Sequence, residues 1–180
     1  MSGSVSLSVI IPGSTNTAPV AVDDVATVEA GSNTSIANFI LITNPSYYLE
    51  DQRLLSNDSD ADGDTLTITQ VDGQNLNGAA ITVPGSNGGF FKVFPDGKAE
   101  FDATTGFEAI AEGGSTTSAI TYTVSDGKGG TDTATVTVTI NGVNDNPNAV
   151  DDAISTTESD SVIIDMLAND SDVDGDVVSL

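Results

Sequence analysis

The stretch Thr133-Ala134-Thr135-Val136-Thr137-Val138-Thr139-Ile140 decides the fold class of this chain. Threonines and apolar residues alternate along it, and this period of two residues predicts a β-strand that buries one face. Ala119–Val124 and Thr65–Thr69 repeat the pattern with other residues. Because no stretch of the chain has a convincing helical period, we expect an all-β protein.

Turn signals separate the expected strands from one another. Asp72-Gly73, Pro95-Asp96-Gly97 and the glycine-rich run Asp126–Gly130 are combinations that favour tight turns. Several short strands joined by regular turns are typical of two sheets packed face to face. The sequence therefore predicts a two-sheet β-sandwich.

Two short motifs occur twice in the chain. Ala21–Asp24 recurs as Ala149–Asp152, which is a shift of 128 positions (24 to 152). Asn57–Asp64 recurs almost unchanged as Asn169–Asp176, which is a shift of 112 positions (58 to 170). Because the second shift is smaller than the first (112 against 128), the first copy holds 16 additional residues between its two motifs.

The repeated motifs predict three parts. Residues 1–17 are expected to be the last strand of a preceding repeat, Val5–Ile11, followed by a linker. Residues 18–143 are expected to form one complete repeat, with the additional residues inserted near 39–53. Residues 144–180 are expected to be a linker and the truncated start of the next repeat.

The charge of the chain limits its partners. It carries 27 acidic residues against 4 basic ones, for a formal net charge of −23. Nucleic acid and anionic membrane surfaces repel such a protein, so we expect neither as a partner. No stretch is long and apolar enough to insert into a membrane, and residues 1–13 lack the basic region of a signal peptide.

The chain contains neither cysteine nor histidine. This excludes disulfides, thiolate and imidazole metal sites, and the Ser-His-Asp and Cys-His forms of catalysis. A secreted domain without disulfides needs other cross-links, and bound metal ions are one option.

The repeated loop Asp58-Ser59-Asp60-Ala61-Asp62-Gly63 has the D-x-D-x-D-G pattern of an oxygen-lined calcium loop. Calcium suits such a cluster because it accepts 6–8 oxygen ligands in a loose geometry, whereas magnesium needs tighter octahedral packing. The loop is not an EF-hand, because Thr69 stands at the twelfth position in place of glutamate. A solvated polar turn at the start of a strand is the alternative interpretation.

Asn57–Asp64, Tyr122–Gly127 and Gly142–Pro147 together resemble cadherin-like repeats, and more narrowly the VCBS-type repeats of large bacterial RTX adhesins. The resemblance implies a Greek-key β-sandwich of the cadherin and immunoglobulin kind, arranged in tandem. It also implies a non-enzymatic adhesion protein that is secreted or on the bacterial cell surface, with Ca²⁺ bound between neighbouring repeats of the same chain.

The resemblance further implies which residues bind calcium. The cadherin ligand positions correspond to Glu29, Asp60, Asp62, Asp126, Asn144, Asp145, Asn146, Asp172 and Asp174. The candidate set also includes the remaining loop carboxylates, Asp58, Asp64 and Asp170.

Two departures from the cadherin pattern reduce the number of ions that we expect at a junction. The chain has no D-R-E sequence, although Glu108 and Glu112 lie in that region, and Gly142 stands where the linker has its first aspartate. The pairs Asp23-Asp24 and Asp151-Asp152 follow the linkers, and they are either additional ligands or charged strand edges that block aggregation.

We expect calcium to stiffen the junctions between repeats, and three alternatives stay open. The 39–53 insertion, with Phe39, Tyr47 and Tyr48, is a candidate binding loop for a cell-surface or glycan target. Paired carboxylates also serve in enzymes that act on polysaccharides. A self-formed isopeptide cross-link would use one of the three lysines, which are Lys92, Lys98 and Lys128.

Overall fold

The computed structural model describes residues 15–31 and 53–180. The all-β fold is confirmed in this part of the chain, which contains eight strands, one 3-10 turn and no α-helix. The elements are β1 (Asp24–Glu29), η1 (Leu54–Ser56), β2 (Thr67–Val71), β3 (Gln74–Asn75), β4 (Ile81–Pro84), β5 (Phe90–Val93), β6 (Ala99–Asp102), β7 (Ser115–Ser125) and β8 (Thr131–Asn141). The expected strand Val5–Ile11 and all of the 39–53 insertion except Arg53 lie outside the described residues.

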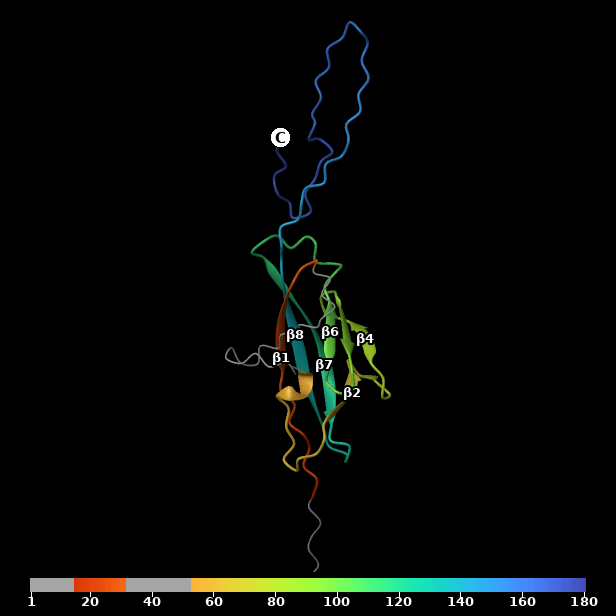
Figure 1. The fold of residues 1–180 in the computed structure, drawn as a ribbon, viewed down its shortest axis with the longest axis vertical. Helices are drawn as coiled ribbons and strands as arrows, with labels where there is room; N and C mark the ends of the chain where they lie inside the picture. The colour runs from red at the N-terminus through yellow and green to blue at the C-terminus, as the bar shows by residue number, and fades with distance from the viewer. Residues whose placement is uncertain (1–14, 32–52) are drawn as a thin grey trace, which may run out of the picture.

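The strands form two sheets, as expected for a sandwich. One sheet has the order β1-β8-β7-β2-β3 and the other has the order β4-β5-β6. Strand β1 pairs with β8 in parallel, and the other neighbours pair antiparallel. The pairing of β1 with β8 joins the first and last strands of the described residues. Figure 1 shows both sheets running along the long axis.

The hairpin of β7 and β8 is the longest paired unit, with 11 residues in each strand. Its inner face is the one that the alternation predicted. Ile120 pairs with Val136 and Tyr122 pairs with Ala134, and all four side chains are buried. Because a strand buries every second residue, the threonines of β8 fall on the opposite face.

The core between the sheets contains a row of aromatic rings. The ring centroids of Phe91 and Phe101 lie 4.5 Å apart, and those of Phe101 and Phe107 lie 6.3 Å apart. Complete burial of one such side chain contributes about 1.5–3 kcal/mol. Gly89 faces this row, and a Cβ atom there would stand 2.4 Å from the ring of Phe101.

The two ends of the sandwich carry different segments (Figure 1). The leading segment (residues 15–20), the loop 57–64 and the β7–β8 turn lie at one end, which we call the N-end. Residues 144–180 extend from the opposite end, the C-end, where β8 finishes. Their single β pairing is the isolated bridge between Asn148 and Ser171. The described residues contain no helix of the length and apolarity needed to cross a membrane.

Candidate metal centre

The loop 57–64 is wound around one carboxylate. Oδ1 of Asp60 accepts hydrogen bonds from the backbone N–H groups of Asp62 (2.8 Å) and Asp64 (3.1 Å). Gly63 has a φ angle of 76°, a left-handed conformation that favours glycine and lets the chain turn here. The loop therefore satisfies Oδ1 of Asp60 locally and leaves its Oδ2 for another partner.

The β7–β8 turn holds a second carboxylate in a similar way. Oδ1 of Asp126 accepts the N–H groups of Lys128 (2.7 Å) and Gly130 (3.0 Å). Oδ2 accepts a hydrogen bond from the side-chain amide of Asn16, and this bond, with the backbone bonds, holds the pKa of Asp126 below its ordinary value. Asp126 is thus fixed as an anion at the N-end.

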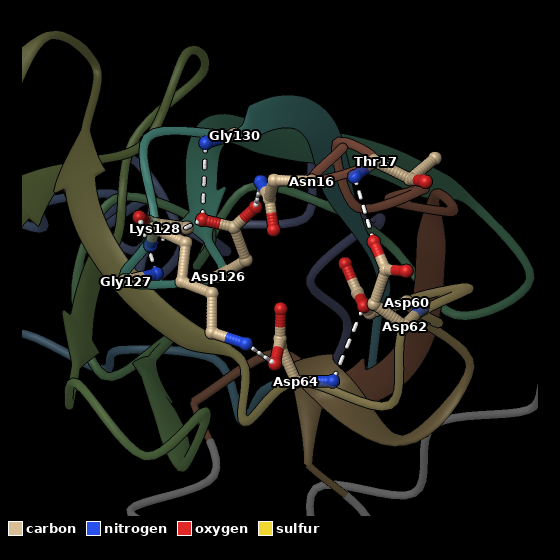
Figure 2. Close-up of polar contacts among 10 residues, drawn as sticks. Asn16, Thr17, Asp60, Asp62, Asp64, Asp126, Gly127, Lys128 and Gly130 are labelled. Carbon is tan, nitrogen blue, oxygen red and sulfur yellow. Dashed lines mark hydrogen bonds and ion pairs between the residues drawn. The ribbon is translucent and has the colours of Figure 1, made fainter. Parts of the chain in front are cut away.

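Three carboxylates converge at the N-end. One oxygen each from Asp60, Asp64 and Asp126 lies within 4.8 Å of the other two. Oδ2 of Asp60 and Oδ2 of Asp64 are both buried without a hydrogen-bond partner. Figure 2 shows Lys128 reaching from the turn to Asp64, and this ion pair raises the pKa of Lys128. We call the three carboxylates the acidic cluster.

The leading segment is bound to the same place. Asn16 donates to Oδ2 of Asp126 at 2.7 Å, and the N–H of Thr17 donates to Oδ2 of Asp62 at 2.7 Å. Asp62 is exposed, and its oxygen grips the backbone of the leading segment (Figure 2). The N-end therefore joins the leading segment, the loop 57–64 and the β7–β8 turn through carboxylates.

The chemistry of the acidic cluster fits a calcium ion. Carboxylate oxygens are the ligands that calcium prefers, and the three side chains come from a compact loop and a tight turn. Three negative charges face one positive charge, that of Lys128, so a divalent cation removes the remaining repulsion. The two buried oxygens without partners also gain a ligand in this way.

Asp23, Asp24 and Asp58 lie apart from this cluster. Asp58 is not one of the three converging carboxylates, and its Oδ1 accepts the N–H of Val22 at 2.8 Å. Asp24 points inward from β1, and its Oδ2 accepts the hydroxyl of Tyr122 at 2.7 Å. Oδ1 of Asp23 accepts a backbone N–H of β8 at 2.8 Å. The repeated motif Asn57–Asp64 thus supplies Asp60 and Asp64 to the acidic cluster and Asp58 to the backbone of Val22.

Burial changes the proton affinity of two of these groups. Desolvation raises the pKa of Asp24 to about 7, against the lowering effect of the Tyr122 hydroxyl, and nearby Asp58 adds to the rise. Desolvation also raises the pKa of Asp58 to about 6, with a contribution from the negative charge of Asp132. Both shifts mean that negative charge at this place is destabilised when no cation is bound.

The expected ligands at the C-end are not gathered in the same manner. Glu29 ends β1, and its Oε1 accepts a hydrogen bond of 3.4 Å from Asn141. Asn144 and Asn146 are exposed, and the N–H of Asp145 donates to Oδ2 of Asp174 at 2.7 Å. In residues 15–31 and 53–180, no second group of three acidic side chains converges as the acidic cluster does.

The second copy of the loop repeats the hydrogen bonds of the first. Oδ1 of Asp172 accepts the N–H groups of Asp174 (2.9 Å) and Asp176 (3.3 Å), as Asp60 does for its neighbours. Oδ1 of Asp170 accepts the N–H of Val150 at 2.8 Å, as Asp58 does with Val22. Because no sandwich surrounds the second copy, this geometry is local to the sequence. Asp151 and Asp152 are exposed there.

Three residues of the N-end were not predicted from the sequence to lie at a metal site: Asn16, Thr17 and Lys128. A signal for Asn16 exists, because the shift of 128 positions that relates the repeated motifs places Asn16 opposite Asn144 of the expected linker. The lysine lies next to the expected hairpin ligand Asp126 in the sequence, but nothing in the sequence shows that it turns toward Asp64.

Comparison with protein families identifies the fold family of this chain. A family model described as a bacterial cadherin-like domain matches residues 16–142. The matched range begins at Asn16 and includes the whole acidic cluster. No curated protein matches the chain.

Proposed function

The chain belongs to the bacterial cadherin-like domain family, and on this premise we propose that it is a calcium-binding structural repeat of a bacterial adhesin. The family is one of adhesive and structural domains, which fits an extracellular or surface protein and not an enzyme. The observation that carries the proposal is the convergence of Asp60, Asp64 and Asp126 within 4.8 Å.

In the proposed mechanism, calcium joins elements that are far apart in the sequence. Asp60 and Asp64 come from the loop 57–64, and Asp126 comes from the β7–β8 turn. The same loop and turn hold the leading segment through Asp62 and Asp126. Neutralising the cluster therefore fixes the direction in which the leading segment enters the sandwich.

The stiffening of a tandem array is the consequence that we propose. The hydrogen bond from Thr17 to Asp62 has its equivalent in the bond from Asp145 to Asp174. In both copies, the loop therefore binds the backbone of the segment that precedes it. With calcium at each such end, neighbouring repeats of the same chain form a stiff stalk, as in the VCBS-type repeats of RTX adhesins. Extracellular calcium modules bind with a Kd of about 10⁻⁴–10⁻³ M, so we expect the sites to fill at the calcium concentration found outside cells.

The proposal predicts a measurable stabilisation. Calcium at a hundredfold excess over its Kd adds about 2.7 kcal/mol to the free energy of unfolding. For a protein of this size, that corresponds to a rise in Tm of about 5–10 °C. Asp64→Asn removes one charge of the acidic cluster, and Glu112→Gln removes one exposed charge near the C-end as a matched control.

Thermal melts in EDTA and in millimolar calcium test the proposal. We expect the rise in Tm in the wild-type chain and in Glu112→Gln, and a loss of most of it in Asp64→Asn. A wild-type Tm that is the same in EDTA and in calcium would contradict the proposal. A full calcium-dependent rise of the Tm in Asp64→Asn would also contradict it.

A further inference from the structure

A second group of oxygens lies around the backbone of Val22. The N–H of Val22 donates to Oδ1 of Asp58 at 2.8 Å, and its carbonyl oxygen accepts from the side-chain amide of Asn57 at 3.1 Å. The hydroxyl of Tyr122 lies 3.3 Å from the same carbonyl oxygen and 2.7 Å from Oδ2 of Asp24. Asn57 and Asp58 are therefore held directly by the backbone of Val22, and Asp24 is held through the hydroxyl of Tyr122.

The other end of each side chain is bare. Oδ1 of Asp24, Oδ1 of Asn57 and Oδ2 of Asp58 are buried and accept no hydrogen bond of normal geometry. The side-chain amide of Asn57 nevertheless lies close enough to Asp24 to lower its pKa. Asp24 as a whole is 0% exposed. An unsatisfied buried polar group costs about 1–3 kcal/mol, and more when it is charged. The three side chains are neighbours, because Asn57 and Asp58 both act on the pKa of Asp24. Three unpartnered oxygens on neighbouring side chains point to a bound cation.

The charge around Asp24 and Asp58 indicates which kind of ligand would bind there. Asp24 and Asp58 carry two carboxylates, and the neighbouring carboxylates of Asp23 and Asp132 add negative charge. Asp23 and Asp132 are themselves held by backbone N–H groups of Thr135 and Ala21. All three bare atoms are hard oxygens, which favour calcium or a similar divalent ion over a softer metal.

We propose that Asp24, Asn57 and Asp58 form a second cation site, separate from the acidic cluster, that takes a divalent ion such as Ca²⁺ through their three bare oxygens. The site shares no ligand with Asp60, Asp64 or Asp126, so it does not rest on the proposed function. The bound ion joins the start of β1 to the loop 57–64.

Tyr122 supplies a direct optical test. The chain has no tryptophan and three tyrosines, and the hydroxyl of Tyr122 is bonded to Asp24. A luminescent Tb³⁺ ion bound beside Asp24 would thus receive excitation energy from this ring. In a background with Tyr47→Phe and Tyr48→Phe, Tyr122 is the only tyrosine that remains.

The experiment measures tyrosine-excited Tb³⁺ emission in this background, together with calcium stoichiometry by calorimetry. We expect emission that millimolar calcium displaces, that Asp24→Asn removes and that Asp64→Asn retains. We also expect Asp24→Asn to bind one equivalent of calcium fewer than its parent. Tyr122→Phe should remove the emission and keep the equivalent, because the three oxygens are unchanged.

Several results would overturn the second site. Tb³⁺ emission that survives in Asp24→Asn would contradict the proposal. Emission that is lost in Asp64→Asn would also contradict it, because the ion would then belong to the acidic cluster. Unchanged stoichiometry in Asp24→Asn also counts against it. If Asp24→Asn fails to fold, Asp58→Asn takes its place, because it keeps the acceptor for the N–H of Val22. Loss of calcium in Asp64→Asn alone would leave the proposed function intact and reject the second site.

Discussion

The side-chain amide of Asn16 donates a hydrogen bond of 2.7 Å to Oδ2 of Asp126, across 110 positions of sequence. Asp126 also belongs to the acidic cluster with Asp60 and Asp64. One carboxylate therefore takes part both in holding the leading segment and in the candidate calcium site. For this reason we expect calcium to affect the direction of the leading segment as well as the stability of the sandwich.

The ammonium group of Lys128 occupies part of the acidic cluster, and a bound calcium ion must displace it from Asp64 wholly or in part. It pairs with Asp64, and the charges of Asp60 and Asp62 also raise its pKa. We expect Lys128→Met to lower the Tm in EDTA and to lower the Kd for calcium by less than about tenfold, because exposed ion pairs contribute little. Calorimetric titration measures the Kd. Weaker calcium binding in Lys128→Met would mean that the lysine supports the ion.

Gly130 leaves space for Asp126. A Cβ atom at this position would lie 2.2 Å from Oδ2 of Asp126 and 2.8 Å from the Cα of Ala18. We expect Gly130→Ala to move the carboxylate and to weaken calcium binding by tenfold or more, which corresponds to a loss of about 1.4 kcal/mol of binding free energy. The control is Gly142→Ala at the C-end, where the added Cβ would lie 2.0 Å from the carbonyl oxygen of Ile110.

The two glycine variants separate a local effect from a general one. Both should lower the Tm in EDTA, because each Cβ collides with its surroundings. Only Gly130→Ala should change the calcium Kd. Equal calcium affinity in both variants would show that Asp126 is not a ligand.

The buried carboxylate of Asp24 predicts an unusual pH dependence of stability in EDTA. Its pKa in the folded chain is about 7, against an ordinary value of 3.8, so the folded state holds a proton that the unfolded state has already lost. Stability due to this group therefore falls as pH rises from about 4 to 7 and is constant above that. The loss is at most about 4 kcal/mol, from about 1.4 kcal/mol per pKa unit.

Comparison with Asp24→Asn isolates this contribution, because asparagine does not titrate and keeps an oxygen for the Tyr122 hydroxyl. Asp23, Asp58, Asn57 and Tyr122 face Asp24 in both proteins. Urea unfolding at a series of pH values should show the variant gaining stability relative to the wild type between pH 4 and 7. A constant difference across this range would mean that Asp24 is ionised throughout.

The fold follows from features that are local in the sequence. Alternation in β7 and β8 identified the buried face correctly, because a half-buried strand shows its period directly. The Asp72-Gly73 turn was also predictable, and both residues have positive φ angles there. The parallel pairing of β1 with β8 was not predictable, since it joins residues more than a hundred positions apart.

The candidate site was predictable in its residue types but not in its grouping. The D-x-D-x-D-G pattern pointed to the loop, and the repeat explains why Asp172 copies the geometry of Asp60. Asp58 and Asp60 belong to different groups because the N–H of Val22, which is distant in the sequence, binds Asp58. The sequence left Asp24 open as either an additional ligand or a charged strand edge, and the structure buries it because β1 turns that face toward Tyr122.

The most direct measurement is a crystal structure of the wild-type chain grown in millimolar calcium, with anomalous scattering used to locate the ions. We expect an ion about 2.3–2.6 Å from carboxylate oxygens of Asp60, Asp64 and Asp126. We also expect that Asn16 still contacts Asp126 and that the ammonium of Lys128 has moved away from Asp64. Density without an ion at the acidic cluster, with Lys128 still paired to Asp64, would contradict the proposed calcium site.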